Sequence, residues 1–489
     1  MAVQRSVRLR RWSLALGTSI AAMGVASSAQ AQCSPDPVTS FNTTTCTGTD
    51  NDGLIADAFA ARVVVAEGAT VRGGFFAPID TRSQSATFTI NGTVDGDSRI
   101  GFLVSNGQPY QAPCDPYAGA SVIVCPPGLQ TYYPSARADI TVGAAGTVTG
   151  GQGLVSRRLS SNSSGEITVT LTNEGTIAGT SGAAIRDAST VLTVSNKAGG
   201  TIRGVGTAID TDGTLRLVNA GAIEGSVISR TTGSTNDGSS IDTLAGTITG
   251  DLTLGAGNDT LAARYEAGRI VTGISGAIDG GAGIDTLDMR LATSADFATL
   301  PLLTGFERLS LRMSDAPVVA IGTAGGVIDG ALALGGDGTV TINGTLTGTG
   351  PVLTAASFDG APTIVNVGTI QGTSGGANTY LVRISDAKRF QNDGLIDAAG
   401  NGVSINAQGM FVNAGTLQAS GTALDLWGSG FTNTGTIRST AGVGAIMNGS
   451  SGTNWSNSGT IEGAIAAVRL SSDLANTGLI TSPGLAVDL

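Results

Sequence analysis

Apolar and polar residues alternate in short runs along most of the chain, and glycine, asparagine or serine separates one run from the next. Residues 167–173, for example, read Ile-Thr-Val-Thr-Leu-Thr-Asn. A period of two residues is typical of a β-strand with one buried face. Apolar residues at helical spacing are absent after residue 31. The pattern therefore predicts an all-β protein made of many short strands.

One motif, apolar-x-Asn-x-Gly-Thr-Ile, recurs with small changes, and a clear copy runs from Leu171 to Ile177. A second element of the type Gly-x-Ala-Ile-x follows most copies, as at 206–210, 421–425 and 484–488. Within each of two groups, the asparagine returns every 19–26 residues. The repeated asparagines are Asn173, Asn196, Asn219, Asn366, Asn392, Asn413, Asn433, Asn457 and Asn476.

This matching from repeat to repeat predicts a right-handed parallel β-helix, a solenoid of roughly 18–20 coils. Successive repeats of a sandwich or a propeller need not match in this way, whereas each residue of a β-helix stacks on its counterpart one coil away. Stacked Thr, Ile and Val would fill the core, and the asparagines would form a hydrogen-bonded amide ladder. We therefore interpret the asparagines as structural. Regular coils are expected at 62–250 and 341–489, and less regular ones at 251–340.

The first 31 residues have the features of a secretory signal peptide with a short signal helix. Four arginines, the first of them Arg5, precede an apolar stretch at about 14–25, and Ala29-Gln30-Ala31 forms a cleavage signal. A lipoprotein is the competing interpretation because Cys33 follows closely, but Gln32 is not the small residue that lipid attachment requires. We therefore expect export from the cell.

Charge limits the partners of the exported chain. Removing the four arginines of the signal leaves 22 basic residues against 37 acidic ones. Such an acidic surface repels phosphate backbones, so nucleic-acid binding is not expected. The 74 glycines accompany regularly spaced Val, Ile and Leu, which argues against a disordered chain.

The four cysteines form two close pairs, Cys33 with Cys46 and Cys114 with Cys125. In an oxidising compartment, local pairing is the simplest of the possible disulfide connectivities. Zinc is the competing interpretation, but the spacings are wide and the chain contains no histidine. We expect two disulfides, the first within an N-terminal cap at 32–61.

At the Asn-x-Gly-Thr-Ile repeats, together with the signal peptide and the low Cys and Lys content, the chain resembles the passenger region of autotransporters, the bacterial type V secreted proteins. The resemblance is clearest at 138–250 and 340–489. It implies a β-helical rod that crosses the outer membrane and is displayed at the cell surface or released. It also implies an outer-membrane β-barrel translocator as a partner.

One departure from that family lies at the end of the chain. The sequence ends at Ala486-Val487-Asp488-Leu489, inside a repeat, without the long amphipathic strands of the family's barrel. We therefore expect either a fragment or a translocator that is a separate polypeptide.

The absence of histidine removes the general base of Ser-His-Asp hydrolases, so Gly96-Asp97-Ser98-Arg99 is interpreted as a chance likeness to a nucleophile motif. Polysaccharide lyases and glycosidases need no histidine, but they need clustered acids and sugar-stacking aromatic residues. The chain shows scattered acids and few aromatics. We therefore do not expect an enzyme.

Two glycine-rich segments are candidates for calcium binding. Residues 280–287 fit the Gly-Gly-x-Gly-x-Asp-x-Leu repeat of calcium-binding β-rolls, and 254–261 fit it in part. Their acids, Asp259 and Asp285, are 26 residues apart, close to one coil. Since β-rolls take ligands from tandem turns, the simpler interpretation is that both segments are glycine turns of the β-helix. No other cofactor is expected.

The best candidate for recognition is an insertion at 107–134. It contains Cys114, Cys125, several prolines and four of the six tyrosines, namely Tyr110, Tyr117, Tyr132 and Tyr133. A braced, Tyr-rich loop on a rigid scaffold suits binding. The alternative is a loop that only covers the N-terminal end of the β-helix.

Together these features predict a non-catalytic, surface-exposed or secreted passenger, an adhesive or structural rod that contacts a host, matrix or cell-surface ligand. The alternative is a carbohydrate-active enzyme on the same scaffold. A groove with two or more acids and an arginine would favour the enzyme, whereas flat Thr/Asn faces would favour the rod. A third possibility is a spacer for another domain.

Overall fold

The computed structural model describes residues 33–489 except 107–109, 113–129, 133–134, 159–165, 190, 232–237, 324–326, 357–359, 375, 377–378, 407–408, 429 and 450–453. The expected signal peptide thus lies outside the described residues. The described chain is an all-β parallel solenoid of about 17 turns, close to the number expected, and contains no helix. The fold class predicted from the repeats is confirmed.

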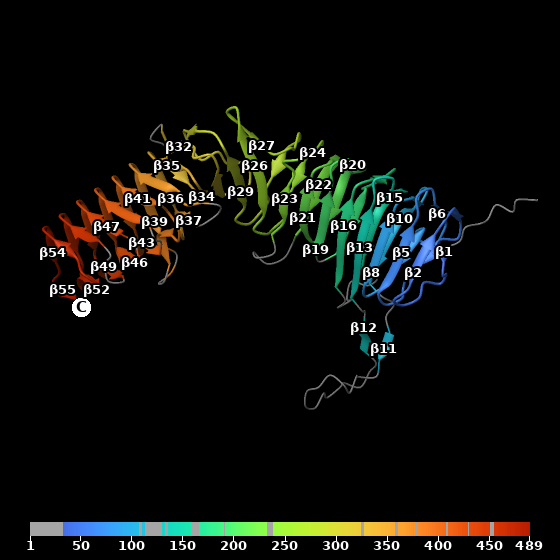
Figure 1. Cartoon of the computed structure of the whole chain (residues 1–489), viewed down its shortest axis with the longest axis horizontal. Helices are drawn as coiled ribbons and strands as arrows, with labels where there is room; N and C mark the ends of the chain where they lie inside the picture. The colour runs from blue at the N-terminus through green and yellow to red at the C-terminus, as the bar shows by residue number, and fades with distance from the viewer. Residues whose placement is uncertain are drawn as a thin grey trace, which may run out of the picture.

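The solenoid is an elongated, gently arched stack, with the described N-terminal segment at one end and the C-terminus at the other (Figure 1). At the usual spacing of ~4.8 Å between neighbouring strands, this number of turns gives an axis of roughly 80 Å. Each turn pairs only with the turns before and after it, so the molecule is a linear stack of similar units.

A long sheet runs through the whole stack and receives at least one strand from each turn. Pairing is parallel except at the two short strands β1 and β27, which pair antiparallel with β2 and β26. The strands of the long sheet are β1 (Cys33–Ser34), β2 (Thr43–Cys46), β5 (Ala61–Val65), β8 (Ala86–Ile90), β13 (Ala136–Val142), β16 (Ile167–Asn173), β19 (Val191–Asn196), β21 (Thr214–Asn219), β23 (Ser240–Asp242), β26 (Thr260–Glu266), β27 (Arg269–Val271), β29 (Thr286–Leu291), β31 (Arg308–Met313), β34 (Ala331–Gly336), β37 (Leu353–Ala355), β40 (Tyr380–Ile384), β43 (Asn401–Asn406), β46 (Leu424–Trp427), β49 (Val443–Asn448), β52 (Ala466–Leu470) and β55 (Leu485–Asp488).

The N-terminal sheet completes the turns of the first part of the chain. Most of these turns give it two strands, and the long strand β20 spans both positions. Its strands are β3 (Thr49–Asp50), β4 (Leu54–Ile55), β6 (Thr70–Arg72), β7 (Ile79–Thr81), β9 (Thr93–Asp95), β10 (Ile100–Ser105), β14 (Thr147–Gly150), β15 (Gln152–Arg157), β17 (Thr176–Gly179), β18 (Ile185–Asp187), β20 (Thr201–Thr211), β22 (Ala222–Ser229), β24 (Thr247–Ile248), β25 (Leu252–Thr253) and β28 (Ile278–Asp279).

Two separate sheets complete the turns of the second part. The first C-terminal sheet contains β30 (Ala295–Phe297), β32 (Val318–Ile321), β35 (Thr339–Ile342), β38 (Thr363–Asn366), β41 (Arg389–Asn392), β44 (Met410–Asn413), β47 (Gly430–Asn433), β50 (Trp455–Asn457) and β53 (Ala475–Asn476). The second C-terminal sheet contains β33 (Val327–Asp329), β36 (Thr345–Thr349), β39 (Thr369–Thr373), β42 (Leu395–Ala398), β45 (Thr416–Ala419), β48 (Thr436–Ser439), β51 (Thr460–Glu462) and β54 (Leu479–Thr481).

The main apolar core extends from Cys33 to Val468, and a second, small cluster contains Ala77, Leu103 and Val155. Like side chains stack in columns, because parallel in-register pairing places each residue on its equivalent in the next turn. Phe390, Phe411 and Phe431 form such a column, with ring centroids 5.4 and 6.0 Å apart. The motif glycine is required by the same stacking, since a Cβ added at Gly415 would lie 2.1 Å from the carbonyl oxygen of Gly394.

The repeat motif occupies different corners in the two parts of the stack, where a corner is the place at which the chain passes from one sheet to the next. Asn173 ends a strand of the long sheet, and the chain then enters the N-terminal sheet. Asn392 instead ends a strand of the first C-terminal sheet, and the chain then enters the second. The motif has therefore moved one corner along the chain relative to the long sheet. The change falls within residues 251–340, where the N-terminal sheet ends and the C-terminal sheets begin.

Parallel stacking begins close to the N-terminal end of the described residues. Strand β2 already pairs in parallel with β5, in the register Thr43 to Arg62, so residues 43–55 form part of the first turn. At this end only β1 departs from the parallel arrangement, because it pairs antiparallel with β2. The disulfide between Cys33 and Cys46 links these two strands and confirms that predicted pair.

Candidate functional site

The repeated asparagines form two separate hydrogen-bonded ladders. In the first, Asn173 donates to Asn196 and Asn196 to Asn219, at 2.8 Å each, and Asn219 then donates to the hydroxyl of Thr243 at 2.7 Å. In the second, each amide donates to the next at 2.6–2.8 Å, through Asn366, Asn392, Asn413, Asn433, Asn457 and Asn476. All except Asn476 are buried. Their amides are used within the stack, so they hold turns together and offer no ligand site.

A column of carboxylates replaces the amide ladder where the motif changes corner. The backbone N–H of Ser239 donates to Asp259, that of Asp259 donates to Asp285 at 2.7 Å, and that of Asp285 donates to Glu307 at 2.8 Å. Asp259 and Asp285 are fully buried, and one carboxylate oxygen of each has no hydrogen-bond partner. Burial is the main cause that raises the pKa of Asp285 to about 6.

This column contains both acids that the sequence singled out for calcium. The structure brings Asp259 and Asp285 into adjacent turns and adds Glu307, which lies outside the glycine-rich segments. Among the described residues there is no group of three or more His, Cys, Asp or Glu side chains with the geometry to hold a metal ion. A calcium site here stays a prediction, which calcium-dependent protection of residues 251–340 from protease would test.

The Tyr-rich insertion is described only at its base. Strands β11 (Tyr110–Ala112) and β12 (Gln130–Tyr132) pair antiparallel, with Tyr110 opposite Tyr132, and the hairpin projects from the stack (Figure 1). Tyr117, Tyr133 and the predicted pair Cys114–Cys125 lie outside the described residues. A role for this loop in binding stays a prediction. Replacing 107–134 by a short Gly-Ser linker tests it, because attachment should then be lost.

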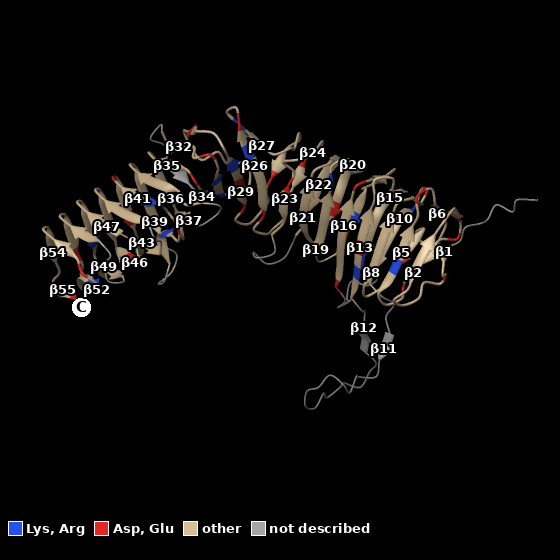
Figure 2. Cartoon of the chain, in the orientation of Figure 1, with Lys and Arg blue, Asp and Glu red and all other residues tan. Residues whose placement is uncertain are grey.

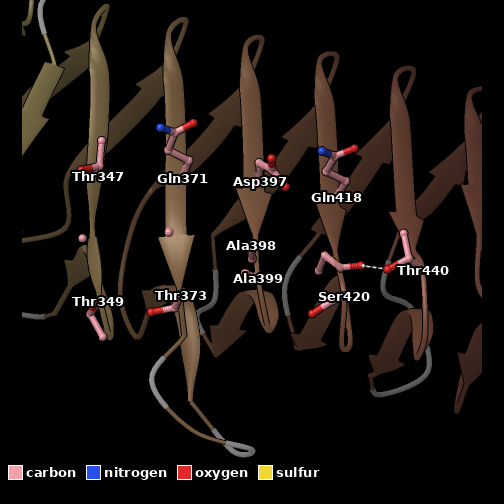
Figure 3. Close-up of a pocket in the computed structure, with 13 residues that line it drawn as sticks. Thr347, Thr349, Gln371, Thr373, Asp397, Ala398, Ala399, Gln418, Ser420 and Thr440 are labelled. Carbon is pink, nitrogen blue, oxygen red and sulfur yellow. Dashed lines mark hydrogen bonds between the residues drawn. The ribbon is translucent and has the colours of Figure 1, made fainter.

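The second C-terminal sheet carries a shallow polar groove on its outer face. Thr347, Gln371, Asp397 and Gln418 lie in register on β36, β39, β42 and β45, one in each turn (Figure 3). A second row of small and hydroxyl side chains, which includes Thr349, Thr373, Ser420 and Thr440, borders the corner beyond them. The groove encloses about 650 Å³ and follows the axis of the stack.

The groove offers hydrogen bonds but little charge. Asp397 is its single ionisable residue among the lining side chains, and no aromatic residue lines it. Stacked strands place equivalent side chains ~4.8 Å apart, so donors and acceptors recur at a fixed spacing along the groove. Figure 2 shows that much of the C-terminal ribbon carries neither basic nor acidic residues. Such a surface suits an extended, uncharged polymer with repeated hydroxyl groups.

A second cavity, of about 670 Å³, lies at the N-terminal end and is called the N-terminal pocket here. Its lining combines residues before β2, the turn around β4, the loop 73–78 and strand β7. It contains four carboxylates and one basic side chain, together with two aromatic rings: Asp36, Asp52, Asp57, Asp80, Arg82, Phe75 and Phe76.

Local backbone contacts shape this pocket. Asp50 accepts hydrogen bonds from the backbone N–H groups of Cys33, Asp52 and Gly53, at 3.1–3.3 Å, and so fixes the turn that presents Asp52. The loop 73–78 turns at Gly74, whose φ is 72° and where a Cβ would lie 2.0 Å from the carbonyl oxygen of Ala77.

Phe76 and Arg157 hold this loop against the stack. The guanidinium carbon of Arg157 lies 4.8 Å from the centroid of the Phe76 ring, in a cation–π contact. The neighbouring Phe75 ring packs edge-on against Phe76 and is 84% exposed.

The charges of the pocket are only partly compensated. Asp80 is 4% exposed; one of its carboxylate oxygens accepts from Arg82 at 3.1 Å, and the other has no partner. Desolvation raises the pKa of both Asp57 and Asp80, the positive charge of Arg82 opposes the rise, and the charge of Asp57 adds to it at Asp80. Desolvation and the nearby Asp52 raise the pKa of Asp36. The pocket is therefore a concave, acidic site with an aromatic edge.

Sequence reasoning missed both the groove and the pocket. The pocket acids belong to different turns at irregular spacings, so no motif announces them. The groove residues do occupy equivalent positions after the motif glycine, two residues beyond the Gly-Thr-Ile threonine or its equivalent. An alignment of repeats by outward-facing position would have found them.

Comparisons of the chain with protein-family models, with curated proteins and with solved structures give no match. Within the part of the chain that the structure describes, no helix has the length and apolar character needed to cross a membrane.

Proposed function

We propose that this protein is an exported, non-catalytic rod of the autotransporter-passenger type that adheres to an extended, uncharged polymer at or outside the cell surface. The single observation that carries the adhesive role is the polar groove of the second C-terminal sheet. Its side chains repeat at the strand spacing, and this repetition matches a ligand that is itself repetitive, such as a neutral polysaccharide.

Three features support a binding role rather than catalysis at the groove. Gln371 and Gln418 are not buried and can donate and accept hydrogen bonds. A lone carboxylate, Asp397, provides no acid–base pair. The open geometry allows a long chain to lie along several turns, so that many weak hydrogen bonds act together.

Export and display rest on the sequence. The signal peptide and the repeat type suggest passage through the outer membrane with the help of a translocator, and the disulfide Cys33–Cys46 suits an oxidising compartment. Expression of the full chain in a Gram-negative host, followed by cell fractionation and surface proteolysis, tests this part. Retention of the intact signal peptide in the cytoplasm would contradict it.

The adhesive part is tested by binding purified protein to immobilised neutral and charged polysaccharides. We expect retention on one or more neutral polymers and weak dependence on salt. A double variant, Gln371→Ala with Gln418→Ala, should reduce retention at least tenfold, since it removes hydrogen-bonding groups from two turns. Retention that is unchanged in this variant would contradict the assignment of the groove.

A matched control is available on the neighbouring face. Gln391 occupies an outward position of β41 in the first C-terminal sheet, where its amide donates to Asp393 at 2.6 Å. Gln391→Ala should leave retention unchanged, because this side chain lies outside the groove. Equal losses in Gln391→Ala and in the double variant would indicate a general effect on the stack.

A carbohydrate-active enzyme on the same scaffold is the second candidate, and the N-terminal pocket is the observation that favours it. The pocket combines several acids with an arginine, and Asp57 is close enough to Asp80 to raise its pKa. Paired carboxylates are the usual catalytic groups of glycosidases. Release of reducing ends from a polysaccharide by the wild-type protein, abolished in Asp80→Asn, would establish this function and overturn the non-catalytic one.

A further inference from the structure

The N-terminal pocket differs in chemistry from the groove and points to a different ligand. Four carboxylates line it, and two guanidinium groups act on them: Arg82, which lines the pocket and is paired with Asp80, and Arg157, which lies over Phe76 and whose charge also reaches Asp80. The charge of Asp80 is only half satisfied, because its second oxygen is buried without a partner. A negative charge left uncompensated beside a cavity attracts a cation more strongly than it would in open water.

The remaining lining limits what that cation can be. Apolar side chains, among them Val38, Leu54 and Ile55, cover a large part of the wall, and the exposed ring of Phe75 stands at its edge. Contact with such a wall adds no binding free energy for a hydrated metal ion. The described residues also contain no group of three or more metal-ligating side chains. An organic cation gains binding free energy from the same wall, because its carbon atoms leave water and its charge can lie over an aromatic face.

Anionic and neutral ligands fit less well. An anion would meet the repulsion of at least three unpaired carboxylates, and this argues against the uronate-rich substrates of polysaccharide lyases. A neutral sugar carries no charge that the carboxylates could attract. A guanidinium or ammonium group flanked by apolar groups uses both the carboxylates and the apolar wall.

We propose that the N-terminal pocket binds a basic side chain of a polypeptide partner, an arginine or lysine that has apolar neighbours in its own sequence. In this complex Asp52 and Asp57 accept hydrogen bonds from the cationic group, Phe75 covers its face, and Asp80 adds to the negative field from below. Arg82 keeps Asp80 in place, and Arg157 keeps the loop 73–78 closed through Phe76. The site is independent of the groove, so the two proposals can fail separately.

Isothermal titration of the purified full chain at low ionic strength tests this proposal with three probes. The first is the peptide acetyl-Leu-Arg-Leu-amide, the second is the same peptide with neutral citrulline in place of arginine, and the third is spermidine. We expect the arginine peptide to bind at least tenfold more tightly than the other two, since only it combines a fixed charge with apolar neighbours. Equal binding of the arginine and citrulline peptides would overturn the proposal, and spermidine binding as tightly as the arginine peptide would overturn the polypeptide partner.

Substitutions in the pocket test whether the arginine peptide binds there. Asp57→Asn and Phe75→Ala should each weaken binding of the arginine peptide at least threefold, and both side chains are exposed enough for the fold to tolerate the change. Glu67→Gln is the matched control, because Glu67 is an exposed acid between β5 and β6 that does not line the pocket. An equal loss in Glu67→Gln would show that net charge alone attracts the peptide and would refute the site. Turnover of a glycan at the pocket, abolished by Asp57→Asn, would refute it as well.

Discussion

The two ends of the solenoid are built from the same repeat but present different surfaces. Residues 341–489 stack almost without interruption, and their outer faces repeat one turn above another, which produces the long polar groove. Residues 33–106 contain a disulfide, a reversed strand and a glycine-hinged loop, and these irregular features enclose a pocket. We therefore associate regular stacking with the extended ligand that we propose for the groove, and interrupted stacking with the single chemical group that we propose for the pocket.

The two parts also differ in which corner carries the stacked asparagines. The change of corner coincides with residues 251–340, where buried acids replace buried amides. A solenoid can evidently keep one sheet continuous while its repeat moves around it, because each turn needs only to match its neighbours.

The aromatic column should dominate the stability of the C-terminal part. Phe411 is fully buried between Phe390 and Phe431. Phe411→Ala should lower the free energy of unfolding by about 3–5 kcal/mol, since it leaves a cavity in the core. Hydrogen exchange should increase in residues 341–489 and stay unchanged in 33–106. Equal increases in both parts would contradict the linear, nearest-neighbour character of the stack.

The disulfide should stabilise only the N-terminal end. Replacing Cys33 and Cys46 together by serine should cost about 3 kcal/mol of local stability, because the bond closes a short loop in the unfolded chain. We expect faster proteolysis within 33–55 and weaker binding of the arginine peptide, with the groove unaffected. A lower melting temperature of the C-terminal part would contradict this separation.

The two amide ladders should behave alike although they occupy different corners. Asn196 and Asn413 each accept from one asparagine and donate to the next. Alanine at either position should cost about 2–3 kcal/mol, because it removes two buried amide–amide hydrogen bonds, one to the preceding and one to the following asparagine of the ladder. Asn476→Ala, at the exposed end of a ladder, should cost much less. Chemical denaturation of the three variants measures these differences.

The column of buried carboxylates, Asp259, Asp285 and Glu307, should make the stability of residues 251–340 depend on pH. The pKa of Asp285 is raised to about 6 in the folded chain, so the folded state holds its proton more tightly than the unfolded state. Stability from this residue therefore increases as the pH falls from about 7 to 4. Asp285→Asn should raise the melting temperature at pH 7.5 and lose this advantage by pH 4. An equal effect at both pH values would contradict the raised pKa.

The sequence was sufficient to predict the parallel solenoid, because stacking requires matched residues and the Asn-x-Gly-Thr-Ile motif displays that match directly. It was also sufficient for the Cys33–Cys46 bond and for the adjacency of Asp259 and Asp285. The change of corner was hidden, since Asn173 and Asn392 lie in copies of the same Asn-x-Gly-x-Ile pattern and only strand pairing shows which sheet each one ends.

The candidate sites were harder to predict for a related reason. Asp57 and Arg82 are brought together by a turn whose length differs from its neighbours, and Glu307 enters the acid column from outside any glycine-rich motif. Contacts between consecutive turns depend on the exact length of each turn. Sites that form at irregular turns therefore have no repeating pattern in the sequence by which they could be predicted.

Distances along the outer column of the second C-terminal sheet test the central claim of in-register stacking most directly. Spin labels are placed at Thr347 and, in turn, at Gln418, Arg438 or Glu462, which lie three, four and five strands away in the observed register. Electron spin resonance should give mean separations that grow by ~4.8 Å for each added turn. Separations that fail to increase in this order would contradict the parallel solenoid, and with it the repeating groove.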